Sequence, residues 1–260
     1  MNSITGQNFR VDIAQDDADL HQAQRLRYDV FVAELGGDGP EVDHQQRQER
    51  DRYDPYATHL LLRDLSRRPD DNVVGVYRVL TSAGAKAAGQ FYCEDEYDLT
   101  SLKNGPMRLL ELGRSCLHRD YRGGAGLVHL WGALSEYVSA NRIDVLFGVA
   151  SFHGTDVTAK APQLSLLHHH YRAPERYRVH AIGPTAHPMD IMPANAIDRV
   201  AVMRDMPPLI KAYLRLGGTV GAGAFVDHAF NTTDVCLILP TAAVPDRQRQ
   251  RFEQGTRARG

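Results

Sequence analysis

The chain has 260 residues, of which 43% are hydrophobic and 24% are charged, a composition typical of a globular protein with a full hydrophobic core. The net charge of −2 provides no overall field that would favour nucleic acid, so we expect no nucleic-acid partner. The three cysteines have no metal-binding spacing, the N-terminus lacks a signal-peptide pattern, and no apolar run reaches about 18 residues, which together predict a cytoplasmic protein without a membrane span.

The first half of the sequence alternates between strand and helix patterns. Leu20, Ala23, Leu26 and Val30 recur at helical spacing and predict a helix over 19–33. The polar segment 35–57 follows, and its length favours a functional loop over a passive connector. The remaining predicted elements are strands at 8–14, 58–64, 72–81, 107–117 and 144–151, and helices at 91–96 and 125–140.

The second half is less regular. Residues 206–217 are expected to form a basic amphipathic helix that begins at prolines and ends at Gly217. Such a helix either packs on the core or rests on a membrane surface. The other predicted elements are a helix at 157–172 and strands at 176–183, 218–228 and 233–239.

The segment RGGAG at 122–126 lies between a predicted strand and a predicted helix. Glycines allow backbone N–H groups to approach a ligand, and a helix N-terminus attracts anions. Arg119 and Arg122 would add positive charge, so the pattern favours a phosphate or pyrophosphate. The spacing matches neither a P-loop nor a dinucleotide fingerprint. A tight turn without a ligand is the alternative.

The strand before this turn contains Glu111 and Arg114. Residues three apart in a regular strand point to opposite faces, so the two side chains can serve one pocket only if the strand is bulged. Gly113 is the expected position of such a bulge. Without a bulge, the two charges would be solvated on different faces.

The strand, the arginine–glycine turn and the helix resemble the acyl-carrier site of the GNAT acyltransferases. Further segments, among them LRYDVFVAELGG, ERDRYDPYATHLLL and PPLIKAYLRLGGTVGAGAF, occur in an order that resembles the L-ornithine Nα-acyltransferases over residues 8–244. The first half also resembles the acyl-homoserine-lactone synthases. The resemblance implies an α/β fold of GNAT type, with a mixed, bent sheet flanked by helices. It implies one domain over 8–244, with a core at about 8–185, a C-terminal extension at about 186–244 and a polar tail at 245–260.

The resemblance also implies a reaction and its site. A 3-hydroxyacyl chain would move from acyl carrier protein to the α-amino group of L-ornithine and give lyso-ornithine lipid. The residues implied for binding the acceptor are Arg27, Phe31, Glu34, Glu49, Asp51, Asp54 and Arg78. The residues implied for binding the phosphopantetheine of the carrier are Arg119, Arg122, Gly123, Gly124 and Gly126. A solvated run of charges is the alternative reading of the acidic loop.

Aminolysis of a thioester needs a base for the amine, stabilisation of the oxyanion and alignment of the reactants. Glu111 is the candidate general base and Arg114 the candidate for holding a carboxylate or the phosphopantetheine. Cys116 is expected to be a core residue rather than a nucleophile, and His59 a structural one. The three histidines of LHHHY at 167–171 would spread around a helix, so no metal site is expected.

We therefore expect acyl carrier protein and L-ornithine as partners, with the inner membrane surface as a further one. No cofactor is expected on the enzyme itself, because 4'-phosphopantetheine would arrive on the carrier. The alternatives are the same reaction on lysine, glutamine or glycine, an acyl-homoserine-lactone synthase, or a non-catalytic module that binds the acyl carrier. The expected location is the cytoplasm, including its membrane surface.

Overall fold

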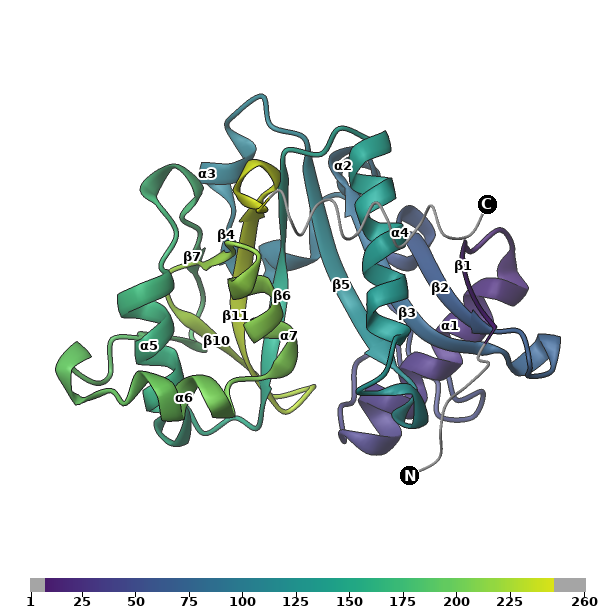
Figure 1. Cartoon of the computed structure of the whole chain (residues 1–260), viewed down its shortest axis with the longest axis horizontal. Coiled ribbons are helices and arrows are strands. Elements are labelled where there is room, and N and C mark those ends of the chain that lie inside the picture. Colours follow the sequence, from purple (N-terminus) through teal and green to yellow (C-terminus); the bar gives the residue numbers. More distant parts are fainter. Residues whose placement is uncertain (1–7, 246–260) are drawn as a thin grey trace. The chain divides into compact units, whose positions relative to one another are not determined.

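Residues 8–245 are described by a computed structural model, and they fall into two units (Figure 1). Unit 1 contains residues 8–80 and 112–142, and unit 2 contains residues 81–111 and 143–245. The predicted boundary between core and extension, at residue 185, falls inside unit 2. The predicted polar tail lies outside the described residues from residue 246 onward.

Unit 1 is built on a sheet with strand order β1-β2-β3-β5. The pairs β1/β2 and β2/β3 are antiparallel, with Val11 opposite Leu62 and Leu60 opposite Tyr77. Its strands are β1 (Phe9–Ile13), β2 (Thr58–Asp64), β3 (Val73–Thr81, of which Thr81 belongs to unit 2) and the second part of β5 (Leu109–Leu117). These ranges confirm the strands predicted from the sequence.

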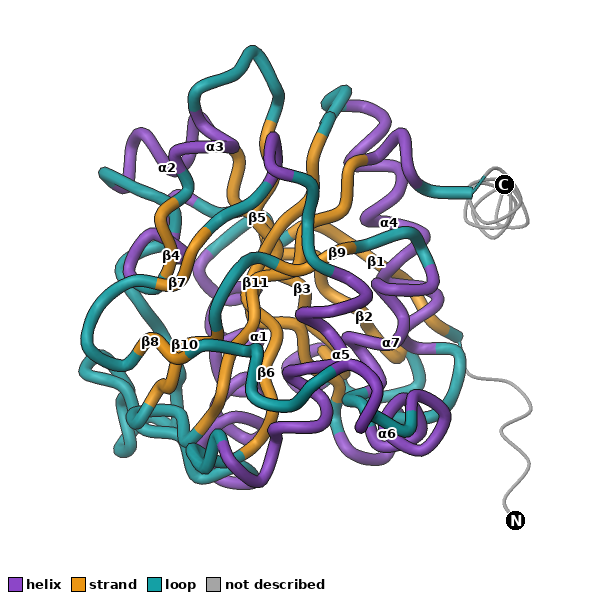
Figure 2. Tube along the Cα trace, turned by 90° about the vertical axis from the view of Figure 1, so that its left-hand side faces the viewer, coloured by secondary structure: helices purple, strands orange, loops and turns teal. Residues whose placement is uncertain are grey.

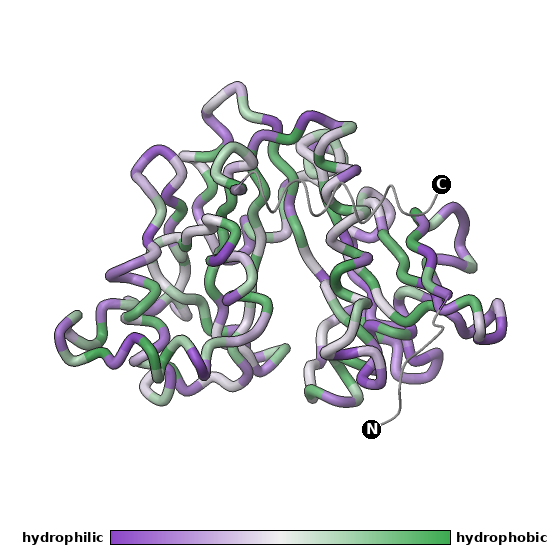
Figure 3. Tube along the Cα trace, in the orientation of Figure 1, coloured by the Kyte–Doolittle hydropathy of each residue, from purple (hydrophilic) through white to green (hydrophobic). Residues whose placement is uncertain are grey.

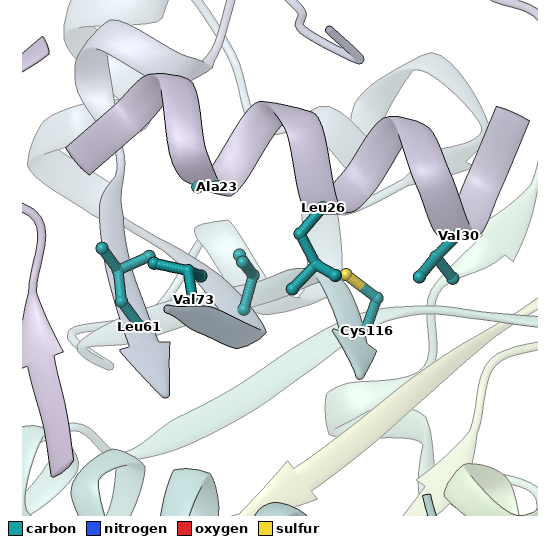
Figure 4. Packing of buried hydrophobic residues seen from close by; sticks show 7 residues of the cluster. Ala23, Leu26, Val30, Leu61, Val73 and Cys116 are labelled. Carbon is teal, nitrogen blue, oxygen red and sulfur yellow. The ribbon is translucent and has the colours of Figure 1, made fainter. Parts of the chain in front are cut away.

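Two helices of unit 1 pack on opposite faces of this sheet. Adjacent leucines of a strand point to opposite sides, and Leu61 packs with Leu26 of α1 (Asp17–Arg27) in a buried cluster that also holds Cys116 (Figure 4). On the other face, a Cβ at Gly75 would lie 3.1 Å from a methyl of Leu130 in α4 (Gly126–Ala140). Glycine at position 75 therefore allows α4 to approach the sheet closely.

The first helix departs from its prediction in one respect. It begins at Asp17, where Asp16 caps it by accepting a hydrogen bond from the Asp19 amide at 2.9 Å. From Tyr28 to Glu34 it continues as a π-helix, which ends where Leu35 N–H donates to the Val30 carbonyl. The predicted helix over 19–33 is thus confirmed in place, but its last third is wider than an α-helix.

Unit 2 contains a mixed sheet in the order β5-β6-β11-β10-β8. The pair β5/β6 is parallel, with Glu111 opposite Phe147, and β6/β11 is antiparallel along its whole length. The strands are the first part of β5, β6 (Val145–His153), β8 (Ala186–His187), β10 (Ala224–Asp227) and β11 (Thr232–Pro240). Further pairs join β9 (Thr219–Val220) to β11 and β4 (Tyr97–Asp98) to β7 (His180–Ala181).

The helices of unit 2 are α2 (Ser82–Ala88), α3 (Thr100–Lys103), α5 (Ala161–Tyr171), α6 (Arg199–Asp205) and α7 (Pro208–Arg215). Contacts join α5 to α6 and β9, and α7 to β11 (Figure 2). In both units the strands are largely hydrophobic and many of the connecting loops are hydrophilic (Figure 3). None of the helices in residues 8–245 combines the length and apolarity required to cross a bilayer.

Some predictions for unit 2 were wrong. The strand expected over 176–183 is a 3-10 turn followed by the two residues of β7. The strand expected over 218–228 is divided into β9 and β10, because Gly223 adopts a φ of +86° and bends the chain between them. Helices α2, α3 and α6 were not predicted, since each spans about two turns or less.

Candidate active site

Three arginines and three carboxylates form a connected ion-pair network in unit 1. Arg27 Nε lies 2.5 Å from Glu49 Oε2, and Arg27 Nη1 lies 2.7 Å from Asp54 Oδ1. Arg78 Nη1 lies 2.5 Å from Asp51 Oδ1 and 2.8 Å from Asp54 Oδ1. Arg114 completes the network through Nε, 3.0 Å from Glu49, and Nη2, 2.9 Å from Asp51. The structure thus brings together six residues selected from the sequence.

These residues come from four separate segments of the chain. Arg27 ends α1, Arg78 lies on β3 and Arg114 on β5, while the acidic residues come from the loop that precedes β2. That loop is fixed to α1, because Glu49 N–H donates to the Gln24 carbonyl and the Gln24 side chain donates to Asp54. The long polar segment is therefore held in place by specific contacts rather than left as a solvated run of charges.

Arg114 is where β5 departs from regular strand geometry. Its φ is +47°, a left-handed conformation that costs a residue with a side chain about 1–2 kcal/mol. The sequence predicted an irregularity between Glu111 and Arg114 and assigned it to Gly113. The structure instead places the left-handed residue at Arg114 itself, one position later.

The network controls the ionisation of its members. Burial alone raises the pKa of Glu49, but the charges of Arg114 and Arg27 outweigh it, so that the pKa of Glu49 lies below its usual value. Burial likewise opposes ionisation of Asp54, yet Arg27 and Arg78 hold its pKa well below the usual range. The side chain of Arg27 is fully buried, whereas those of Asp51 and Arg114 keep 14% and 12% of their surface exposed.

The two remaining members of the predicted acceptor set, Phe31 and Glu34, lie on the π-helix that follows α1. Phe31 is partly buried against the α1 core cluster. Glu34, at the end of the π-helix, accepts two hydrogen bonds from Arg122, at 2.5 and 2.8 Å. This pair joins Glu34 to the predicted phosphate-binding turn. The substrate-binding roles of the whole set stay predictions.

His59 and Cys116 have the structural environments expected for them. His59 is buried, and its Nε2–H donates to the Asp54 carbonyl at 3.1 Å. Burial lowers the pKa of His59 and so favours the neutral ring. Burial also raises the pKa of the Cys116 thiol to about 12, which keeps it protonated and unsuited to nucleophilic attack.

Glu111, the candidate base, belongs to unit 2. It is buried, and its two oxygens accept hydrogen bonds from the backbone N–H groups of Cys93 at 2.6 Å and Tyr92 at 2.9 Å. These amides begin the 3-10 turn at Tyr92–Asp95 and fix the carboxylate in one orientation. A carboxylate oxygen can accept more than one hydrogen bond, so an engaged oxygen still has capacity for a proton or a water.

The glycine turn has features of an anion site. The helix α4 starts at Gly126, and no side chain caps its first backbone N–H groups. Gly123 adopts a φ of +74°, which favours glycine, and a Cβ at Gly126 would lie 3.2 Å from a Leu62 methyl. Gly124 lies between them, and the side chain of Arg119 is 78% exposed. Phosphate binding here stays a prediction.

One acidic cluster was not identified from the sequence. Ligand oxygens of Glu96, Asp227 and Asp234 lie within 4.8 Å of one another in unit 2, and Glu96 and Asp234 are buried. The antiparallel pairing of β10 with β11 brings the two aspartates together, and Glu96 directly precedes β4. Glu96 is more than 130 positions from either aspartate, so no local sequence signal reveals the cluster.

Comparisons with known proteins identify relatives of this chain. A family model described as an acetyltransferase (GNAT) domain matches residues 26–132. An L-ornithine N(alpha)-acyltransferase from Rhodobacter capsulatus is 50% identical over 97% of this chain and 98% of its own length. A protein of the same name from Brucella abortus is 40% identical over 92% of this chain and 87% of its own length.

Solved structures show the fold. The N-acyl amino acid synthase FeeM from uncultured soil microbes superposes with a TM-score of 0.54 and 10% identity, over 91% of this chain and 93% of its own. The CoA-dependent acyl-homoserine lactone synthase BjaI gives a TM-score of 0.52 and 16% identity, over 94% and 90%. The predicted α/β fold of GNAT type is therefore confirmed, and the chain belongs to the L-ornithine N(alpha)-acyltransferase family.

Proposed function

We propose that this protein transfers a 3-hydroxyacyl chain from acyl carrier protein to the α-amino group of L-ornithine, and that the product is lyso-ornithine lipid. The observation that carries the proposal is the 50% identity, over almost the whole chain, to a protein named L-ornithine N(alpha)-acyltransferase. The carrier and the 3-hydroxyacyl group come from the family resemblance of the sequence. The remaining support comes from the chemistry of each group of residues.

The donor thioester would be held through the phosphate of its phosphopantetheine arm. The uncapped start of α4, the left-handed Gly123 and the exposed Arg119 support this role for the glycine turn. Arg122 is paired with Glu34, so an incoming phosphate would compete with that carboxylate for the guanidinium. Because acyl carrier protein is acidic, this local positive charge would also favour its approach.

The acceptor would meet a network that is already balanced in charge. Glu49, Asp51 and Asp54 carry three negative charges, and Arg27, Arg78 and Arg114 carry three positive ones. Only the more exposed members can touch a substrate without rearrangement. We therefore assign Asp51 to the side-chain ammonium of ornithine and Arg114 to its carboxylate, while the buried members hold these two in place.

The reaction would proceed by direct aminolysis. The amine nitrogen attacks the thioester carbon, the C–N bond forms and the C–S bond breaks, and the carrier leaves as its thiol. The neutral amine loses one proton as the C–N bond forms, and Glu111 would accept it, directly or through a water, and return it to the departing sulfur. Its two backbone N–H donors support this role by fixing the carboxylate while leaving further acceptor positions on the same oxygens.

A product assay tests the proposal. Purified protein would be incubated with 3-hydroxyacyl carrier protein and an equimolar mixture of amino acids, and the products identified by mass spectrometry. We expect 3-hydroxyacyl-ornithine acylated on the α-nitrogen. A parallel reaction with the same acyl group on coenzyme A tests the carrier requirement, and equal rates with both donors would contradict it.

The other outcomes separate the alternatives. Acylated lysine, glutamine or glycine would leave the reaction class and overturn the acceptor. A second parallel reaction offers S-adenosylmethionine as the acceptor, and an acyl-homoserine lactone formed there would indicate the acyl-homoserine-lactone synthase reaction. Carrier binding with no product from any amino acid would indicate a binding module and would refute the base role of Glu111.

A further inference from the structure

His168 and His169, at the C-terminal end of α5, lie close to Asp190, and the proposed acyl transfer uses none of these three residues. His169 Nε2 lies 3.2 Å from Asp190 Oδ1, and His168 Nε2 lies 3.9 Å from Asp190 Oδ2. One ligand atom from each of the three residues lies within 4.8 Å of the others. All three belong to unit 2.

A buried anchor holds the two parts of this group together. Ser165, one turn before the histidines, is fully buried, and its Oγ accepts hydrogen bonds from Ile191 N at 3.2 Å and Met192 N at 2.9 Å. His169 Nε2–H also donates to the Met192 carbonyl at 2.8 Å. The segment that carries Asp190 is therefore fixed to α5 rather than left as a free loop.

Asp190 meets the two histidines through tertiary structure. Consecutive residues of a helix point about 100° apart, which is why the sequence predicts no metal ion bound by neighbouring histidines. In the structure the two rings are 5.1 Å apart at an interplanar angle of 86°, and both reach Asp190. The third ligand comes from a residue about 20 positions away, so helical spacing alone could not reveal the group.

We propose that His168, His169 and Asp190 bind a divalent transition-metal ion, with Zn²⁺ as the best fit. Two imidazoles and a carboxylate suit Zn²⁺, whereas Mg²⁺ and Ca²⁺ prefer oxygen ligands. Ligand atoms about 2.0–2.2 Å from a tetrahedral ion lie about 3.4 Å from each other, and the two measured N–O separations lie on either side of that value.

The surroundings define how such an ion would be bound. The histidine side chains are 21% exposed and that of Asp190 is 59% exposed, so the ion can enter from solvent and a water can fill the fourth position. To bind through Nε2, His169 gives up its hydrogen bond to Met192 and carries its proton on Nδ1. The ion would join α5 to the 190–192 segment, which is a role in stability rather than in acyl transfer.

Zinc titration of the metal-free, full-length protein tests the inference. We compare the wild type with His168→Ala, His169→Ala and Asp190→Asn, using competition with a chromophoric chelator. His170→Ala is the matched control, because His170 is an exposed neighbour on the same helix and is not part of the group. We expect one Zn²⁺ per chain in the wild type and the control, and at least about tenfold weaker binding in each of the three variants.

A second measurement keeps the test decisive if a variant is less stable. A ligand that binds the folded state raises the melting temperature, so Zn²⁺ should raise it in the wild type and in His170→Ala but not in the other variants. Co²⁺ in place of Zn²⁺ should give the visible absorption of a tetrahedral site. Equal zinc affinity in all variants, or an equal loss in His170→Ala, would show collective binding by surface histidines and overturn the proposal.

Discussion

The substitution Glu49→Gln removes one negative charge from the buried network without changing the size of the side chain. Glu49 is 1% exposed and accepts from Arg27 Nε at 2.5 Å and from Arg114 Nε at 3.0 Å. The network would pass from neutral to a net charge of +1. Since the Arg27 side chain is fully buried and stays charged, the substitution leaves an uncompensated cation inside the protein.

Breaking a buried ion pair by removing one partner costs about 3–5 kcal/mol, so we expect the free energy of unfolding to fall by that amount. Urea unfolding followed by circular dichroism measures it, provided that the slope with urea is unchanged. Glu136→Gln on the exposed face of α4 is the control and should change stability by less than about 0.5 kcal/mol. A loss below about 1 kcal/mol for Glu49→Gln would refute the description of the network as buried and balanced.

The double substitution Glu49→Gln with Arg114→Met restores charge balance. We expect it to be less destabilising than the sum of the two single changes, with a coupling of about 0.5–3 kcal/mol. Additive effects would mean that the two side chains do not interact in solution.

The pH dependence follows from the same residues. The pKa of Glu49 is lower in the folded protein than its usual 4.5, so its contribution is present above that pH and is lost as the pH falls. Asp51 and Asp54 act in the same direction. The wild type should lose stability steeply below about pH 4.5, and Glu49→Gln should lose it less steeply. Parallel profiles would contradict the assignment.

Other predictions concern catalysis and packing. Glu111→Gln should lower turnover by about 10²–10⁴ while carrier binding persists, and unchanged turnover would refute the base role. Arg122→Gln should raise the KM for the carrier by at least about tenfold, because a hydrogen bond to a charged group contributes about 1.5–3 kcal/mol. Arg68→Gln is the control, because Arg68 is exposed, and it should leave this KM unchanged. An equal rise of KM in both variants would contradict phosphate binding by Arg122. Gly218→Ala should destabilise by about 1–3 kcal/mol, because its Cβ would lie 2.7 Å from the Tyr213 carbonyl. A Cβ at Gly132 in α4 would meet no atom within 4 Å, so Gly132→Ala should stabilise the protein by about 0.5–1 kcal/mol. If both glycine variants changed the melting temperature in the same direction, this pair of predictions would be contradicted.

Local physics explains which parts of the fold could be predicted. The apolar run Leu60–Leu61–Leu62 and the helical spacing of Ala23, Leu26 and Val30 are properties of short segments, and β2 and α1 formed where they indicated. The strand predicted over 176–183 did not form as a whole, because strand pairing depends on residues distant in sequence. Its pattern resembled a strand, but only His180 and Ala181 form one, β7, which pairs with β4.

The candidate site shows the same division. The sequence by itself determined the GNAT-type fold, the glycine turn before α4 and the charged residues of the network, because each depends on neighbouring residues or on a family pattern. Tertiary structure decided which charges pair, that Arg114 is the left-handed residue of β5, and that Asp190 meets the histidines of α5. These features join positions distant in sequence, and their geometry depends on how whole elements pack.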